Sequence, residues 1–382
     1  MKRFGILALA VLAFVSPALG QVDFETQAKF AVLTDFESGT VIFQKDADQA
    51  MEPASMAKLM TLAVVFDEIK NGRLSMDDHF FVSEHAWRTG GAMSDGSTMF
   101  AELNSQIRVE DLVRSVIIQS GNDAAIVLAE GIAGSESTFA LMMNELADDI
   151  GLTGSNFTNP TGLPDPNMYV TARDLATLAR YLIRDYPDYY HYFSEPAMEW
   201  NGIRQPNRNS LVEQGIGVDG LKTGHTEAAG YGSVISSDAG DRRLIAVVHG
   251  LTSMAQRNEE GRKLITWGAR AFERVAAYPE GTVIATADVY GGEAPSVGLV
   301  GEGEVALYLP RGSRRCLNAQ VVYTGPLMPP VAQGEEIAEL RVFCEDRLVQ
   351  TAPLYAAETV EDGGITRKAT DALKQIALGW LP

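Results

Sequence analysis

The stretch EPASMAKLMT, residues 52–61, places a serine and a lysine three positions apart at the start of an apolar helix. On a helix Ser55 and Lys58 would share one face, with Cβ atoms about 5 to 6 Å apart. A lysine amine whose pKa is lowered by burial can take the proton of a serine hydroxyl and make it a nucleophile. The same spacing also fits a capping serine and a lysine whose stem lies along the helix. Taken alone, the pair leaves both interpretations open.

The residues around this stretch predict a β-hairpin followed by a helix. Two β-rich runs, FAVL at residues 30–33 and VIFQK at residues 41–45, flank the turn-forming stretch TDFESGT. Pro53 suits the first turn of the helix that follows, and the pair Asn71-Gly72 marks its end.

The middle of the chain, from about residue 75 to 185, is predicted to be mainly helical. The stretch TARDLATLARYLI begins with Thr171, whose hydroxyl suits an N-cap, and continues with apolar residues at helical spacing. The loop before it, NFTNPTGLPDPNMY at residues 156–169, is rich in turn formers. We expect this loop to lie at the surface.

Later strands complete the first domain. Residues 218–249 contain three short β-rich runs separated by turn residues, and residues 257–277 have apolar side chains at helical spacing. Because the late strands can pair with the N-terminal hairpin, we predict an α+β domain over residues 21–279 with a helical middle and an antiparallel sheet. For residues 280–360 we predict a small all-β, sandwich-like domain, with the boundary near residue 280.

The last residues, 361–382, are predicted to be a linker and an amphipathic helix. Its apolar face is formed by Ile365, Ala369, Ala372, Leu373, Ile376 and Trp380. Such a helix is too short and too charged to cross a bilayer, but it can lie on a membrane surface. Docking on the β domain explains the same pattern equally well.

The first twenty residues have the pattern of a signal peptide. Lys2 and Arg3 precede an apolar run at residues 6–15, and small residues lead up to Gly20, where cleavage is expected. We therefore predict an exported protein, with a retained N-terminal anchor as the alternative. Removing Lys2 and Arg3 takes the net charge from −19 to −21, and a surface this acidic disfavours nucleic acid.

Neither a metal site nor a cofactor is expected. Cys316 and Cys344 show no metal-ligand spacing, and an exported location permits a disulfide between them or two free thiols. The histidines are scattered at positions 79, 85, 191, 225 and 249. Residues 215–220 contain G-x-G-x-x-G, but the chain continues there as a strand instead of opening a helix, so nucleotide binding is not expected.

Two further fragments accompany the Ser55 stretch. Ser120, Gly121 and Asn122 lie between two helical runs, where Ser and Asn also act as ordinary caps and Gly as a turn residue. The stretch Lys222-Thr223-Gly224 lies on a predicted strand, where a lysine also serves to protect an exposed edge. Each fragment is ambiguous alone, whereas the three in this order are not.

S-x-x-K, then Ser-x-Asn, then K-T-G resembles the motif set of penicillin-binding proteins and serine β-lactamases. Together with NGIRQPNRNSL and VDGLKTGHTEAAGYG, the motifs are most similar to those of the low-molecular-mass D-alanyl-D-alanine carboxypeptidases of bacterial cell walls, over about residues 25–382. The resemblance implies a β-lactamase/transpeptidase-like catalytic domain that removes the terminal D-alanine of peptidoglycan stem peptides through an acyl-enzyme. It also implies acylation by β-lactams and a periplasmic location on the outer face of the cytoplasmic membrane.

The resemblance also assigns roles to the catalytic positions. Ser55 would attack the carbonyl of the penultimate D-alanine, with Lys58 as general base. Ser120 would relay a proton to the leaving amine, and Asn122 would bind the substrate amide and order Lys58. Lys222 would keep the local potential positive and depress the pKa of Lys58.

The substrate-binding positions follow in the same way. Thr223 and Arg257 would bind the terminal carboxylate, Gly224 completes the K-T-G motif, and the backbone N–H of His225 would form the oxyanion hole with that of Ser55. Thr161 stands where some family members have histidine, so no catalytic role is assigned to it.

Three alternatives use the same fold. A serine β-lactamase of class A needs a glutamate for deacylation, and residues 150–210 contain no E-x-x-L-N stretch. An endopeptidase that cleaves cross-links would use the same acyl-enzyme route. A non-catalytic wall-binding protein is disfavoured because all the motif residues are present.

Overall fold

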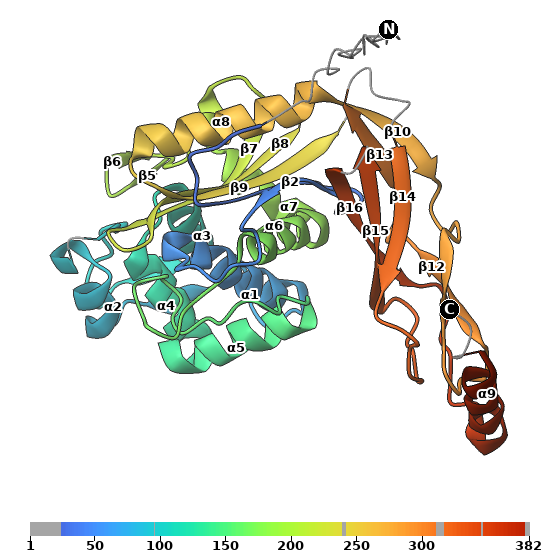
Figure 1. Ribbon diagram of the computed structural model, residues 1–382. Helices are drawn as coiled ribbons and strands as arrows, with labels where there is room; N and C mark the ends of the chain where they lie inside the picture. Colours follow the sequence, from blue (N-terminus) through green and yellow to red (C-terminus); the bar gives the residue numbers. More distant parts are fainter. Residues whose placement is uncertain (1–23, 95, 239–241, 311–316, 345–346, 379–382) are drawn as a thin grey trace, which may run out of the picture.

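The computed structural model describes residues 24–94, 96–238, 242–310, 317–344 and 347–378 (Figure 1). The predicted signal peptide at residues 1–20, Cys316 and Trp380 lie outside these ranges. The described chain forms a mixed helix and sheet domain followed by strands and a final helix.

The first domain contributes the strands β2-β1-β9-β8-β7, in this order, to an antiparallel sheet that continues from β2 to β16 (Arg347–Ala356) of the later strands. Its strands are β1 (Phe30–Asp35), β2 (Val41–Lys45), β7 (Val218–Thr226), β8 (Gly230–Asp238) and β9 (Arg243–Leu251). The hairpin β1–β2 lies beside β9, with Phe30 opposite His249. Both the hairpin and its pairing with the late strands were predicted, and both predictions are confirmed.

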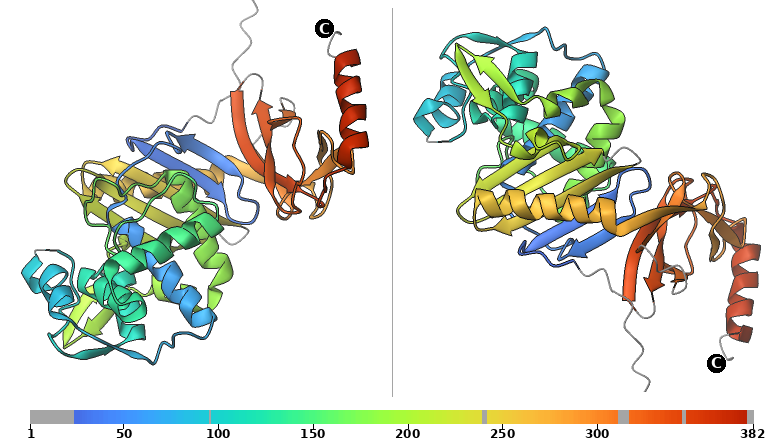
Figure 2. Two further views of the ribbon diagram at one scale, coloured as in Figure 1. Left: turned by 90° about the horizontal axis from the view of Figure 1, so that it is seen from below. Right: turned by 90° about the horizontal axis from the view of Figure 1, so that it is seen from above.

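Helices cover both faces of this sheet. One face carries α8 (Met254–Ala271), and the other carries the helical middle of the chain (Figure 2). The elements of the middle are η1 (Ala54–Ala57), α1 (Lys58–Lys70), α2 (Glu84–Thr89), η2 (Ala92–Ser94), α3 (Val109–Ile118), α4 (Asn122–Ala133), α5 (Glu136–Asp149), α6 (Ala172–Asp185), α7 (Pro187–Tyr190), η3 (His191–Ser194) and η4 (Ser210–Glu213). Short strand pairs connect them: β3 (His79–Phe81) with β4 (Gln106–Arg108), and β5 (Ala197–Trp200) with β6 (Ile203–Pro206).

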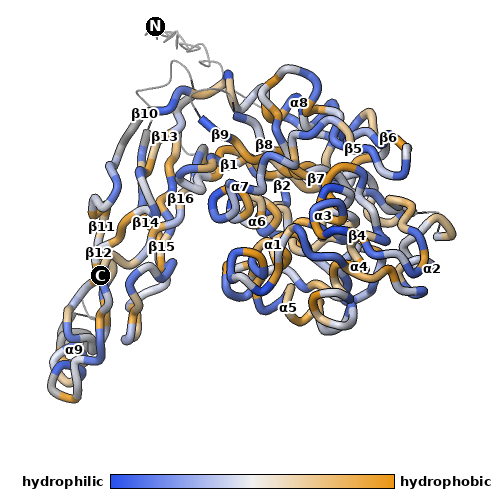
Figure 3. The backbone as a smooth tube through the Cα atoms, turned by 180° about the vertical axis from the view of Figure 1, so that it is seen from behind, coloured by the Kyte–Doolittle hydropathy of each residue, from blue (hydrophilic) through white to orange (hydrophobic). Residues whose placement is uncertain are grey.

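Local signals in the sequence explain where the helices begin and end. The hydroxyl of Thr171 accepts a hydrogen bond from the backbone N–H of Asp174 at 3.0 Å, which caps α6 as predicted. α1 ends at Asn71, and Gly72 follows with a φ of 71°, a conformation that glycine adopts without strain. β8 and β9 are buried almost throughout and form a hydrophobic centre between the two helical layers (Figure 3).

One sequence prediction about this domain is wrong, and a second holds only in part. Residues 272–277, expected to continue the helix, instead form the strand β10 (Phe272–Tyr278), because β13 (Val305–Pro310) supplies an antiparallel partner. The loop at residues 156–169 is not wholly at the surface, since Phe157 and Thr161 are each 1% exposed. The loop turns these residues inward against α1 and α5, and Asn144 holds the backbone of Phe157 from both sides.

The later strands form the expected β domain. They are β11 (Ala285–Asp288), β12 (Ser296–Val300), β13 (Val305–Pro310), β14 (Leu317–Tyr323), β15 (Glu336–Cys344) and β16 (Arg347–Ala356). Since β10 pairs with β13, we propose that the boundary between the two domains lies at Phe272 instead of near residue 280. The final helix α9 (Gly364–Leu378) lies at the far end of the β domain (Figure 1).

Candidate active site

Ser55 lies in the short 3-10 turn η1, and Lys58 is the first residue of α1. In a 3-10 turn, residues i and i+3 lie above one another, and the Nζ of Lys58 is 3.1 Å from the Oγ of Ser55. The predicted contact between the two side chains is therefore confirmed, although a 3-10 turn and not an α-helix makes it. Ser55 is not a capping serine, because η1 has no side-chain cap. Lys58 does not lie along the helix surface, because it is fully buried.

Lys58 has two further partners, both of them carbonyl oxygens. Its Nζ donates to Oδ1 of Asn122 at 2.7 Å and to the backbone oxygen of Thr161 at 2.6 Å. Carbonyl oxygens only accept hydrogen bonds. A neutral amine would therefore direct its two N–H groups to Asn122 and Thr161 and its lone pair to Ser55. This is the geometry that a general base requires.

Burial lowers the pKa of Lys58 to about 7, and the negative charge of Asp123 opposes this shift. The pKa of Lys222, which is 1% exposed, is also lowered, first by burial and then by the positive charges of Lys58, Arg208 and Arg257. The sequence predicted burial and the charge of Lys222 as the causes of a lowered pKa for Lys58, and burial is the main cause found.

The Ser120-Gly121-Asn122 segment enters the site from the start of α4. Ser120 has a φ of 71°, a conformation that is uncommon outside glycine. Its Oγ is buried and has no hydrogen-bond partner among the described residues. The N-cap of α4 is Gly121, without a side-chain bond, so Ser120 is not an ordinary capping serine.

Asp123 fixes the loop that borders this segment. Its carboxylate accepts hydrogen bonds from the hydroxyl of Thr98 at 2.6 Å and from the backbone N–H groups of Met99 and Ala101 at 2.9 and 3.1 Å. The backbone N–H of Asn122 donates to the oxygen of Ser97 at 2.7 Å. Asn122 is thereby held with its side chain towards Lys58.

The Lys222-Thr223-Gly224 segment lies on β7, the strand at the edge of the sheet. An added Cβ at Gly224 would lie 3.1 Å from Cγ of Met56 and 3.1 Å from the oxygen of Pro53. A glycine at this position therefore lets β7 pack closely against the turn that carries Ser55. The buried Lys222 also excludes the interpretation of an exposed lysine on an edge strand.

A group of cations lies beside β7. Arg257, in the first half of α8, is 5% exposed, and burial lowers its pKa to about 10. Its Nη2 donates to the backbone oxygen of Arg208 at 3.3 Å. Within the described ranges, no carboxylate forms an ion pair with Arg257, Arg208 or Lys222. The exposed ring of His225 stacks on Tyr231 with centroids 3.8 Å apart.

The structure thus brings the predicted residues together and adds two that the sequence reasoning missed. The carbonyl of Thr161 binds Lys58, and Arg208 adds positive charge beside Lys222 and Arg257.

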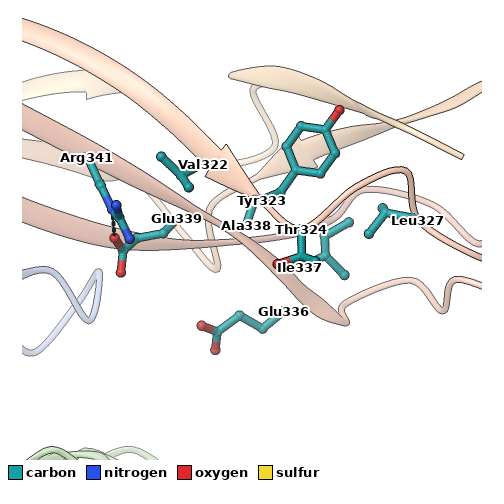
Figure 4. Close-up of a pocket in the computed structure, with 9 residues that line it drawn as sticks. All are labelled: Val322, Tyr323, Thr324, Leu327, Glu336, Ile337, Ala338, Glu339 and Arg341. Carbon is teal, nitrogen blue, oxygen red and sulfur yellow. Dashed lines mark hydrogen bonds and ion pairs between the residues drawn. The ribbon is translucent and has the colours of Figure 1, made fainter. Parts of the chain in front are cut away.

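An open hollow of about 440 Å³ on the β domain, lined by residues of β14 and β15, contains none of the predicted site residues (Figure 4). The part of the chain that the structure describes contains no cluster of potential metal ligands.

Comparison with known proteins decides the family. A family model described as D-alanyl-D-alanine carboxypeptidase matches residues 16–253. The chain belongs to this family. A second model, described as the C-terminal domain of penicillin-binding protein 5, matches residues 272–362. Membership confirms the predicted fold, a penicillin-binding catalytic domain followed by an all-β domain.

Relatives match almost the whole length of the chain. D-alanyl-D-alanine carboxypeptidase DacC of Escherichia coli (strain K12) is 39% identical over 348 residues, which cover 90% of this chain and 87% of the relative. DacA of the same organism is 33% identical over 396 residues, which cover 100% and 97%. The crystal structure of penicillin binding protein 5 from Haemophilus influenzae superposes with a TM-score of 0.71 at 37% identity, and covers 90% of this chain and 100% of that one.

A further similar structure contains a bound antibiotic. Penicillin-Binding Protein D2 from Listeria monocytogenes, in the ampicillin bound form, superposes with a TM-score of 0.58 at 27% identity and covers 64% of this chain and 98% of that one. Because the matched share is about the size of the first domain, this relative bears on the catalytic half of the chain.

Proposed function

We propose that the protein is a serine-type D-Ala-D-Ala carboxypeptidase that removes the terminal D-alanine of peptidoglycan stem pentapeptides. One observation carries the proposal: Nζ of the buried Lys58 lies 3.1 Å from Oγ of Ser55, while two carbonyl oxygens take its other hydrogen bonds. DacC and DacA of Escherichia coli, both named D-alanyl-D-alanine carboxypeptidases, support the same activity.

The reaction follows from the roles of these groups. Lys58 takes the proton of Ser55, whose Oγ then forms a bond to the carbonyl carbon of the penultimate D-alanine. The backbone N–H groups of Ser55 and His225 stabilise the oxyanion, a contribution on the order of a hundredfold or more in rate. Ser120, whose hydroxyl has no partner in the described structure, relays to the leaving amine the proton that Lys58 took from Ser55, so that Lys58 is neutral again. The C–N bond breaks, D-alanine leaves, and water then hydrolyses the ester on Ser55.

The cations beside β7 would select a substrate that ends in a free carboxylate. Thr223 would donate its hydroxyl to this carboxylate, and Arg257 would donate charge-assisted hydrogen bonds. Arg208 adds positive charge beside Lys222 and Arg257 in an otherwise acidic protein. The carboxylate of a penicillin can use the same groups, so we expect β-lactams to acylate Ser55.

The test is release of D-alanine from a tripeptide ending in D-Ala-D-Ala, by the intact protein and by Ser55→Ala. We expect release by the former alone, together with labelling of Ser55 by a fluorescent penicillin. If the protein neither releases D-alanine nor is labelled by the penicillin, a non-catalytic wall-binding protein is favoured. A cross-linked muropeptide dimer reports endopeptidase activity, and rapid steady-state hydrolysis of a cephalosporin would indicate a β-lactamase.

We also propose that the protein is exported and lies peripherally on the outer face of the cytoplasmic membrane through α9. The backbone N–H of Gly291 donates to the carboxylate of Asp371 at 2.9 Å, and a Cβ on Gly291 would meet the stem of Lys368. The polar face of α9 is thus turned to the β domain. Ile365 and Leu373, by contrast, are 88% and 67% exposed, as expected for a helix that inserts its apolar face into a membrane.

The location has its own test. Ile365→Ser and Leu373→Ser together should move the protein from the membrane fraction to the soluble fraction, as should deletion of residues 365–382. Val283→Ser, which changes an apolar side chain that is 54% exposed on the β domain, is the matched control. Unchanged partitioning of the double variant would overturn the proposed contact.

No single helix in the described parts of the chain is long and apolar enough to span a bilayer, and only the bent pair α4 and α5 meets those criteria jointly.

A further inference from the structure

Asn258, the residue after Arg257 on α8, holds one edge of the Arg257 guanidinium. Its Oδ1 accepts hydrogen bonds from Nε of Arg257 at 3.1 Å and from Nη2 at 3.0 Å. The other end of the amide is fixed too, because Nδ2 of Asn258 donates to Oγ of Ser210 at 2.9 Å. A guanidinium only donates hydrogen bonds, so this arrangement requires the amide oxygen to face Arg257.

These contacts leave one edge of the guanidinium for a ligand. Asn258 and the backbone oxygen of Arg208 together accept the hydrogen bonds of Nε and Nη2. The Nη1 group has no partner among the described residues, and it is not buried. Nη1 can therefore donate to an incoming carboxylate while Asn258 and Arg208 keep the group in place.

The side-chain partner of Arg257 is neutral, unlike those of several other arginines among the described residues. Arg243 pairs with Asp219, Arg173 with Asp48, and Arg114 with Glu195. A carboxylate at position 258 would hold the guanidinium equally well but would neutralise it. An amide orients the same group and leaves its positive charge for the substrate.

We propose that Asn258 is a positioning residue that sets selectivity for a free C-terminal carboxylate, by aiming Arg257 without neutralising it. The inference rests on the proposed function and adds a determinant of specificity to it. Asn258 does not touch the substrate; it acts through Arg257. Its loss should therefore change the binding of the charged peptide end more than the chemical step.

Asn258→Asp is the decisive variant, because it keeps an acceptor oxygen at the same place and adds one negative charge. We expect KM for a tripeptide ending in D-Ala-D-Ala to rise about tenfold, with kcat within about twofold. The kcat/KM for the same peptide with a C-terminal amide, which carries no charge, should stay within about twofold. Asn258→Ala, which loses the orientation but adds no charge, should reduce the carboxylate preference less than Asn258→Asp.

Arg262→Gln is the matched control. It makes the same change of net charge on the same helix, at a side chain that is 43% exposed and paired with Glu259. We expect it to leave the preference for carboxylate over amide unchanged. Melting temperatures of the three variants, measured in parallel, separate a loss of folding from a change of selectivity.

The outcomes distinguish the inference from the proposed function. A wild-type protein that releases no D-alanine would overturn the proposed function and the inference with it. An active wild type whose carboxylate preference survives Asn258→Asp would overturn the inference alone. So would a variant that loses kcat equally on both peptides, since that result indicates a general structural role.

Discussion

The lowered pKa of Lys58 makes a quantitative prediction about the rate at which Ser55 is acylated at different pH values. The amine acts as a base only when it is neutral, so acylation should rise as pH rises through its pKa. With a pKa of about 7, the neutral fraction is roughly 9% at pH 6 and roughly 91% at pH 8. We therefore expect the acylation rate to rise about tenfold between these pH values and to level off above pH 8.

An unshifted lysine would behave differently. With the ordinary pKa of 10.5, roughly one amine in three thousand would be neutral at pH 7, and the rate would climb about tenfold per pH unit through pH 9. The position of the plateau therefore distinguishes a buried base from an exposed one.

The assay is the second-order rate of labelling by a fluorescent penicillin, followed from pH 5 to pH 9 with antibiotic far below saturation. Ser55→Ala gives the background, and antibiotic incubated without protein corrects for its own hydrolysis at high pH. A rate that still climbs tenfold per unit at pH 9, or one that is flat over the whole range, would refute Lys58 as a base of lowered pKa.

Two further predictions follow from buried contacts near the site. Gly224→Ala should reduce acylation by about tenfold, because the new Cβ would push β7 away from the Ser55 turn by a few tenths of an ångström; labelling at the wild-type rate would contradict this. His249 is buried against the oxygen of Glu52 with a pKa lowered from 6.5 to about 4. Between pH 6.5 and about pH 4 the imidazole of the unfolded chain therefore binds a proton that the folded protein does not bind. The free energy of unfolding falls as pH falls through this range. Between pH 7 and pH 4.5 the wild type should lose roughly 2 to 3 kcal/mol more than His249→Phe in urea unfolding, and equal losses would exclude the imidazole as the cause.

Much of the site could be predicted because its information is local. The contact between Ser55 and Lys58 depends on three residues of separation, and a tight turn of either helical type would place them together. The cap of α6 by Thr171 is equally local. The pairing of the hairpin with late strands could be predicted because a β-rich run must find partners, and residues 218–249 offered them within the same predicted domain.

The features that the sequence did not reveal depend on tertiary structure or on the backbone. Thr161 contributes a carbonyl oxygen, which every residue possesses, so its side chain carries no signal of the contact with Lys58. Arg208 lies in a loop, and only its position beside Lys222 and Arg257 gives it significance. The strand β10 has apolar residues that also fit helical spacing, and its partner β13 lies more than twenty residues later.

The site is distinguished from the rest of the protein by polar and charged groups that lack a hydrogen-bond or ion-pair partner among the described residues. Ser120 combines a positive φ with a buried hydroxyl that has no partner in the described structure, and each feature costs about 1 to 3 kcal/mol. Lys58 and Lys222 are buried with lowered pKa values, and Arg257 carries a charge without a carboxylate. A peptide ending in D-Ala-D-Ala offers a carboxylate to the cations and a departing amine to Ser120. The groups that destabilise the free protein are therefore those that a bound, reacting substrate would satisfy, which is how binding energy comes to favour the transition state.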